Sequence, residues 1–268
     1  MKKTIKRILF NTRFNLSASN NFLFMRYYKK YQPEKGSLEE LLSNYSLDIG
    51  SAFTVIQIGA NDGITHDPIH KFIKRDHWNG VLLEPQKYVY TRYLSRIYKK
   101  HDNVKVLNAA MGYEDGEAPI YKIGFSNERW STGLTTFDRQ TLEKAFASGH
   151  VARKCAKDGT KIPLDTSLHI VEETVKIISA KSLLQEYHIA KIDLLMIDTE
   201  GFDFEVIKMF DIATTKPGMI IFEHSHLSEK DYQDCLLLFD SNEYVYKKDG
   251  ANTVAIKKEL NRYNYFDN

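Results

Sequence analysis

A glycine-rich turn, followed further along the chain by a carboxylate, is the feature of this sequence with the clearest chemistry. The run 55–63 reads Val-Ile-Gln-Ile-Gly-Ala-Asn-Asp-Gly, and the apolar run 81–83 leads directly to Glu84. Glycine lets the main chain turn sharply and lets a ligand approach it closely. A carboxylate at the end of the next strand can accept hydrogen bonds from both hydroxyls of a ribose. Together these features predict a nucleoside site.

The residues inside the turn indicate which nucleoside ligand fits. Dinucleotide sites use Gly-x-Gly-x-x-Gly, whose second glycine lets a pyrophosphate lie against the backbone at a helix N-terminus. Here Asn61 occupies that position, and Asp62 adds a negative charge that disfavours a phosphate. S-adenosylmethionine fits better, because it carries an adenosine and a sulfonium cation and no phosphate. A nicotinamide-dependent oxidoreductase and a non-catalytic cofactor-binding protein are the alternatives.

The apolar segments predict the sheet that would position these residues. Runs rich in β-branched side chains are typical of buried parallel strands, and segments with helical spacing lie between them. These runs are 53–58, 81–83, 104–109, 192–198 and 219–222. Residues 244–256 read as a terminal hairpin that turns at Asp249-Gly250. We therefore expect a Rossmann-like α/β fold with helices on both faces of the sheet and a ligand at the carboxyl ends of its strands.

Length and charge limit the remaining interpretations. A chain of 268 residues can form one large domain with appendages, and a net charge of +2 is too small to predict a nucleic-acid partner. Cys155 and Cys235 lie far apart and form no metal or redox motif, which favours the reducing cytoplasm. We expect the main domain over 51–258, with a charged insertion at 138–168 and a tail at 259–268. The insertion is either a lid that recognises an anionic substrate or a solvated surface excursion.

Residues 1–50 form a basic and aromatic N-terminal appendage. Residues 1–36 contain nine lysines and arginines and the single acid Glu34, with aromatic residues interleaved. Polar residues interrupt every apolar run before it reaches the length of a secretory signal or a membrane span. The favoured interpretation is a helix packed on the domain with its lysines in solvent. A peripheral contact with an anionic membrane or a partner is the alternative.

Several segments resemble one family. They are 55–63, Glu84-Pro85, Asn108-Ala109-Ala110 and, most specifically, 197–207 with the sequence I-D-T-E-G-F-D-F-E-V-I. Over roughly residues 53–257 the chain resembles the FkbM-type S-adenosylmethionine-dependent methyltransferases. The resemblance implies a class I methyltransferase fold with a seven-stranded, mostly parallel sheet. Met196 and Ala180-Lys181 depart from the family pattern, which has a lysine and an acidic pair at these places.

The resemblance also implies roles for individual residues. Glu84 would hold the ribose, and Asp198 would face the methyl donor. Asn108 and Ala109 would border the adenine. The turn would surround the methionine part of the cofactor; its residues are Gly59, Ala60, Asn61, Asp62 and Gly63.

A methyltransferase that acts on a hydroxyl must also remove its proton. His224 is the first candidate for this general base, because it follows a core strand and titrates near neutrality. Glu200, Glu223 and Asp198 are the alternatives. Glu223 or Asp198 could instead orient His224 or hold a divalent ion, and Glu200 could cap the helix that begins near Gly201. The sequence leaves the metal question open.

The acceptor follows from the resemblance and from charge. The family implies hydroxyls of sugars and polyketides, and the basic insertion favours an acceptor that carries phosphate. We expect O-methylation of a sugar hydroxyl of a surface polysaccharide, or of a nucleotide-linked or phosphorylated sugar precursor.

Overall fold

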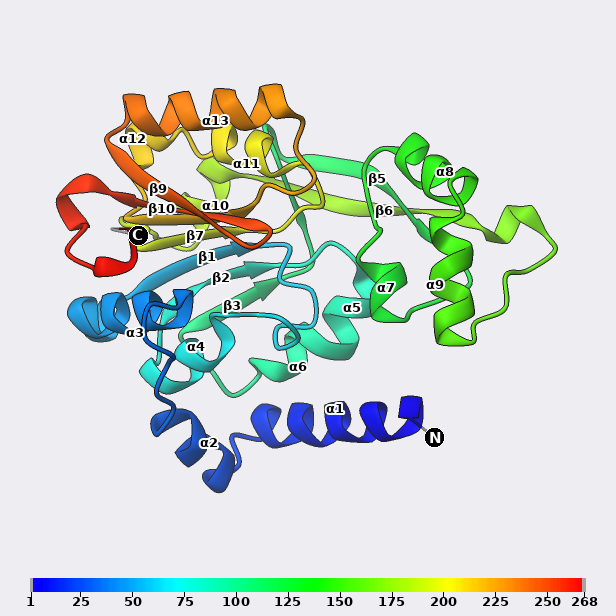
Figure 1. Ribbon diagram of the computed structural model, residues 1–268, viewed down its shortest axis with the longest axis horizontal. Coiled ribbons are helices and arrows are strands. Elements are labelled where there is room, and N and C mark those ends of the chain that lie inside the picture. The colour runs from blue at the N-terminus through cyan, green and yellow to red at the C-terminus, as the bar shows by residue number, and fades with distance from the viewer. Residues whose placement is uncertain (1, 267–268) are drawn as a thin grey trace.

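The computed structural model describes residues 2–266 and is built around a seven-stranded sheet in the order β3-β2-β1-β7-β8-β10-β9 (Figure 1). β1, β2, β3, β7 and β8 are parallel, whereas β10 is antiparallel to both of its neighbours. The strands are β1 Thr54–Ile58, β2 Asn79–Leu83, β3 Val104–Leu107, β7 Leu194–Ile197, β8 Met219–Glu223, β9 Tyr244–Asp249 and β10 Asn252–Lys257. The predicted sheet and its terminal hairpin are confirmed.

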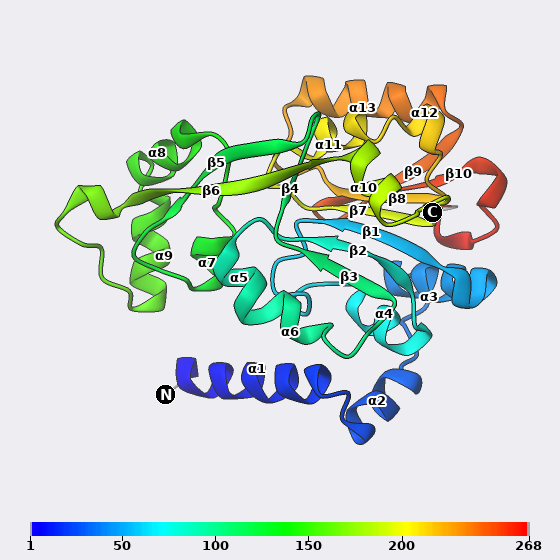
Figure 2. The same cartoon turned by 180° about the vertical axis from the view of Figure 1, so that it is seen from behind.

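Helices cover both faces of this sheet (Figures 1 and 2). On one face lie α3 Leu38–Ile49, α4 His70–Asp76, and a continuous run of α5 Lys87–Val89, the π-helical segment Tyr90–Leu94 and α6 Ser95–Ile97. On the other face lie α10 Ala180–Glu186, α11 Asp203–Met209, α12 Ile212–Thr215 and α13 Glu229–Ser241. Short 3-10 helices also lie at Gly50–Ala52, Thr166–Leu168, Lys258–Leu260 and Asn264–Phe266.

Two hydrophobic cores result, one on each face. Val55 and Leu82 point into the core under α3 and α4, whereas Ile56 and Val81 point into the core under α10, α11 and α13. Successive side chains of a strand point to opposite faces. Because both faces are buried, the central strands are apolar without a break, which is the pattern that made them recognisable in the sequence.

Local signals set the starts of two helices. Ser37 Oγ accepts a hydrogen bond from the Glu40 backbone N–H at 3.2 Å and caps α3, as its spacing predicts. Asp67 Oδ1 accepts from the backbone N–H groups of Ile69 and His70 at 2.9 and 3.1 Å, so this carboxylate caps α4.

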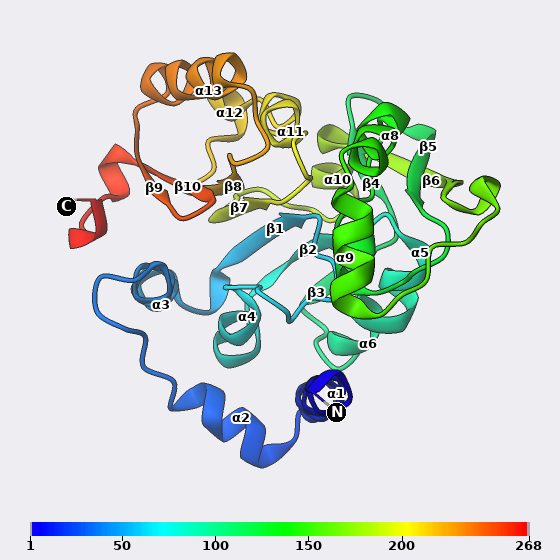
Figure 3. The same cartoon turned by 45° about the vertical axis from the view of Figure 1, so that its right-hand side comes forward.

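A second sheet lies beside the first and was not predicted. It contains β4 Ala110–Gly112, β6 Ile170–Ser179 and β5 Gly116–Ile123, in that order (Figure 3). The strand predicted at 104–109 is therefore wrong at its end, because β3 stops at Leu107 and the chain enters the second sheet at Ala110. The Asn108 side chain stabilises this change of direction by donating to the backbone oxygens of Glu84 and Pro85 at 2.9 and 2.7 Å.

The charged insertion packs on the second sheet. It forms α8 Arg139–Ala147 and α9 His150–Asp158, and α7 Arg129–Thr132 precedes it. Leu142, Val151 and Cys155 bury themselves against Ile123 of β5. The basic side chains predicted for this insertion are exposed; they are Arg139, Lys144, Arg153, Lys154, Lys157 and Lys161.

The N-terminal residues form two helices, α1 Lys2–Ala18 and α2 Phe22–Lys29, which lie outside the helical layer of the domain (Figure 3). α1 packs on α6, and α2 packs on α4. Phe14 and Tyr28 are buried in these contacts. Within residues 2–266, we find no helix of sufficient length and apolarity to cross a membrane.

Candidate active site

Four strand ends meet at one edge of the large sheet. In the sheet order β2-β1-β7-β8 they place Glu84, Gly59, Asp198 and Glu223 side by side. The chain builds β2 and β3 on one side of β1 and adds β7 and β8 on the other, so the strand order reverses between β1 and β7. Ligands of open α/β sheets bind at such a reversal. The tertiary structure therefore brings the predicted cofactor residues to one place.

Gly59 is required where β1 meets β7. Its φ is +81°, and a Cβ at this position would lie 1.9 Å from the backbone oxygen of Asp198. The ends of the two strands are tied together by a hydrogen bond from Asp198 N to Ile58 O at 3.0 Å. A side chain at residue 59 would force β7 away from β1, and this explains the glycine in physical terms.

Glu84 is buried at the end of β2, with only 2% of its surface exposed. Its Oε2 accepts from the Asn61 backbone N–H at 2.9 Å, and its Oε1 accepts from the Gln86 backbone N–H at 2.8 Å. Burial raises the pKa of this carboxyl to about 7. The two backbone donors leave further acceptor capacity on this carboxylate. Ala109 is buried nearby in the chain segment that Asn108 holds against Glu84.

Arg129 closes over the glycine-rich turn from α7. Its Nη1 donates to Asn61 Oδ1 at 2.8 Å and lies 3.3 Å from Asp62 Oδ2. Asp62 is buried, and its Oδ1 accepts from the backbone N–H groups of Ile64 and Thr65. The Asp62 carboxylate thus stabilises the turn through hydrogen bonds and forms an ion pair with Arg129. Arg129 offsets the negative charge of Asp62, and no motif in the sequence marks this arginine.

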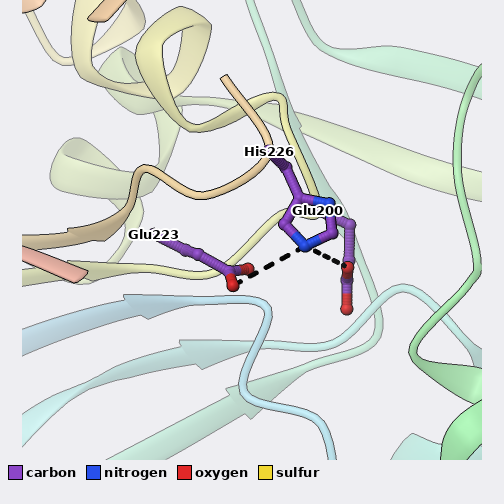
Figure 4. A group of neighbouring side chains, drawn as sticks. All are labelled: Glu200, Glu223 and His226. Atoms are coloured by element: carbon purple, nitrogen blue, oxygen red, sulfur yellow. Dashed lines mark ion pairs between the residues drawn. The ribbon is translucent and has the colours of Figure 1, made fainter. Parts of the chain in front are cut away.

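A cluster of two carboxylates and one imidazole lies at the ends of β7 and β8 (Figure 4). His226 Nε2 is 3.7 Å from Glu200 Oε2 and 3.7 Å from Glu223 Oε1. Glu200 has φ +55°, which lets its side chain reach this position from the turn after β7. Buried Asp203 holds the loop by accepting from the backbone N–H of Glu223 and from the Thr199 hydroxyl. Oxygen and imidazole donors this close together could bind a divalent cation.

Burial and neighbouring carboxylates both raise carboxyl pKa values at this edge. Burial, and then the charges of Glu223 and Asp203, raise the pKa of Asp198 to about 7. Burial, and then Asp198 and Glu223, raise the pKa of Glu200 to about 8, while Arg129 opposes both shifts. Asp198 and Glu200 keep exposed surface, so solvent screens part of this repulsion. A cation at this edge would lower the repulsion between these carboxylates.

His224 and His226 are held differently, although both follow β8. The backbone N–H of His224 donates to Ala251 O, so this residue still pairs with the hairpin. Its ring packs on Tyr232, its Nδ1 is 3.0 Å from Thr253 Oγ1, and burial lowers its pKa. The structure therefore places His226, rather than His224, between the two glutamates. The prediction from the sequence named only His224, and the path of the chain after β8 is what brings His226 to the glutamates.

The sheet order and the glycine turn after β1 agree with the class I methyltransferase fold that the sequence resemblance implies. Residues 57–261 match the family model of the methyltransferase FkbM domain. The chain accordingly belongs to the FkbM methyltransferase family, whose cofactor is S-adenosylmethionine.

Solved structures of methyltransferases are similar to this chain. The FkbM methyltransferase of Methylobacillus flagellatus is 12% identical, with a TM-score of 0.47, over 90% of this chain and 52% of that one. This chain thus spans about half the length of that protein. A putative caffeoyl-CoA O-methyltransferase of Staphylococcus aureus is 11% identical over 95% and 99% of the two chains, with a TM-score of 0.42. The N-terminal domain of human METTL16 in complex with SAH is 10% identical over 85% and 72%, with a TM-score of 0.41. Comparison with curated proteins finds no significant match.

Proposed function

We propose that this chain transfers the methyl group of S-adenosylmethionine to a hydroxyl group of a sugar or glycan. The observation that carries the proposal is the row of carboxylates at the ends of β2, β7 and β8, in a chain of the FkbM family. Burial, and then the neighbouring carboxylates, raise the pKa of Asp198 and Glu200, so a cationic ligand would stabilise their ionised forms. A dinucleotide, which brings two phosphates, would add to the repulsion.

The residues present fit each part of the cofactor. Glu84 would accept hydrogen bonds from the ribose hydroxyls with the lone pairs that its backbone donors leave free. Asp198 would face the sulfonium, and Asn108 and Ala109 would border the adenine. The turn from Gly59 to Gly63, including Ala60, Asn61 and Asp62, would surround the methionine part. Arg129 would bind the methionine carboxylate, because its guanidinium contacts this turn and is 40% exposed.

The cofactor supplies a methyl carbon that the sulfonium already activates, so the chain must align the acceptor and remove its proton. Alignment of this kind can supply about 7 to 11 kcal/mol. We assign the proton transfer to Glu200. Its pKa, raised to about 8, makes the ionised side chain a strong base whose population increases as the pH rises through this value. The side chain is 35% exposed, so an acceptor can reach it. Glu223 and His226 would position Glu200. The contacts of His224 with Thr253 and Tyr232 support Glu200 over His224 as the base.

Charge supports a phosphate-bearing acceptor. Lys144, Lys154 and Lys157 are exposed on α8 and α9 beside the second sheet. A group of exposed cations favours an anionic partner. We therefore propose a nucleotide-linked or phosphorylated sugar, or a polysaccharide built from one. Both cysteines are free thiols in the structure, which supports a reducing compartment such as the cytoplasm.

Two measurements test this function. Calorimetry should detect S-adenosylmethionine and S-adenosylhomocysteine and give no heat with NAD. A screen with radiolabelled methyl donor should then find transfer to sugar phosphates that Glu200→Gln slows about 10²–10⁴-fold. Binding of NAD in place of the methyl donor would overturn the proposal.

A further inference from the structure

We propose that the outer faces of α1 and α2 form a docking surface for an anionic membrane. Six large apolar side chains on these two helices are between 49% and 74% exposed. They are Ile5, Ile8 and Leu9 of α1 and Phe22, Leu23 and Tyr27 of α2. Exposed apolar residues are normally scattered singly over a surface, so a group of this size on adjacent helices marks an interaction site.

The opposite faces of α1 and α2 are packed against the domain. Phe14 and Ser17 on α1 and Tyr28 on α2 are buried against the domain. Ile5, Ile8 and Leu9 lie on the side of α1 away from Phe14, as the spacing of a helix with 3.6 residues per turn requires. The apolar outer face is therefore fixed in place, and it is not produced by a loosely attached helix.

Buried polar contacts provide this anchoring. Ser17 Oγ is 2.9 Å from His70 Nε2 on α4, and the other ring nitrogen of His70 is 2.9 Å from the Tyr98 hydroxyl. Lys74 is fully buried and donates to Ser17 O at 3.3 Å, Asn20 Oδ1 at 2.9 Å and Ile97 O at 2.7 Å. Ser17 and Asn20 lie at the C-terminal end of α1. A cation there also interacts favourably with the negative end of the helix dipole.

Charge selects the occupant of this surface. Arg13, Arg26 and Lys29 belong to the same two helices, and Lys30 follows α2 directly. Glu34 is the first acidic residue of the sequence. A second copy of the chain would place this positive face against itself, which like-charge repulsion disfavours. A nucleic acid would use the cations and leave the aliphatic side chains in water. An anionic bilayer satisfies both, because apolar side chains enter the acyl boundary while lysines and arginines contact the headgroups.

Flotation of the full chain with lipid vesicles tests this inference. The protein should bind vesicles that contain phosphatidylglycerol, bind weakly to pure phosphatidylcholine, and dissociate as salt is added. Leu9→Glu should lower the partition about 10- to 100-fold, since it removes one apolar anchor and adds a repelled charge. Arg26→Gln should lower it about fivefold. The matched control is Leu237→Glu, because Leu237 is 63% exposed on α13, across the sheet from α1 (Figure 1).

Several outcomes would overturn the inference. They are equal binding to both vesicle types, no binding to either, or an equal loss for Leu237→Glu and Leu9→Glu. Two results together would assign the surface to a second copy of the chain instead. Gel filtration would show a dimer that the Leu9→Glu variant does not form, and the protein would not bind vesicles. Cofactor binding by each variant is measured in parallel, so that failure of the proposed methyl transfer is distinguishable from failure of membrane docking.

Discussion

Binding of S-adenosylmethionine should release protons, and Asp198 should be a main source of them. The pKa of Asp198 is about 7 in the free protein, because burial and the neighbouring carboxylates disfavour its charge. At pH 7, about half of the molecules therefore carry a proton on this residue. An adjacent cation lowers a carboxyl pKa by about 1 to 3, so the bound sulfonium would leave Asp198 almost fully ionised.

The expected magnitude is about half a proton from Asp198 at pH 7. Glu200 has a pKa of about 8, so it is mostly protonated at pH 7 and adds to the release in proportion to its nearness to the cation. Titration calorimetry in buffers with different ionisation enthalpies measures the number directly. S-adenosylhomocysteine lacks the charge on sulfur and should release fewer protons than S-adenosylmethionine.

Asp198→Asn is the matched variant, because it keeps the shape of the side chain and removes its titration. It should abolish about half a proton of the release with S-adenosylmethionine and change the release with S-adenosylhomocysteine less. Equal release for the two ligands in the wild-type protein would refute the assignment of Asp198 to the sulfonium. Equal release by the wild-type protein and the variant would refute the raised pKa.

The remaining predictions concern affinity, rate and stability. Glu84→Gln should weaken S-adenosylmethionine binding about tenfold and lower the free energy of unfolding by about 1–3 kcal/mol. The reason is that the amide nitrogen of the new side chain must face a buried backbone N–H. Unchanged affinity in calorimetry would contradict the ribose role. Glu200→Gln should lower kcat about 10²–10⁴-fold. The wild-type rate should rise with pH through about 8, since only ionised Glu200 can accept a proton; abolition of activity by a chelator would instead indicate a metal held by this cluster. Lys74→Ala should lower the free energy of unfolding by about 2–3 kcal/mol, because buried acceptors lose a charged donor. The neighbouring Lys71→Ala, which removes a partly exposed ion pair, should cost less than about 1 kcal/mol in the same denaturation experiment.

The sequence alone determined the sheet and the positions that follow its strands. Strands buried on both faces must be apolar throughout, so their runs are visible without a structure. Gly59 and Glu84 were recognisable because each immediately follows such a run, and parallel strands bring their carboxyl ends to one edge.

Only the tertiary structure decided which side chains reach that edge from elsewhere. Arg129 contacts Asn61 across 68 positions of the chain, from a segment with no periodic pattern. His226 meets Glu200, while His224, two residues earlier, turns toward Thr253. The second sheet and the anchoring of α1 through Lys74 also depend on contacts between distant parts of the chain. A local pattern specifies which residues form a strand or a helix, whereas these contacts depend on how long connections pack, and that is decided by the whole chain.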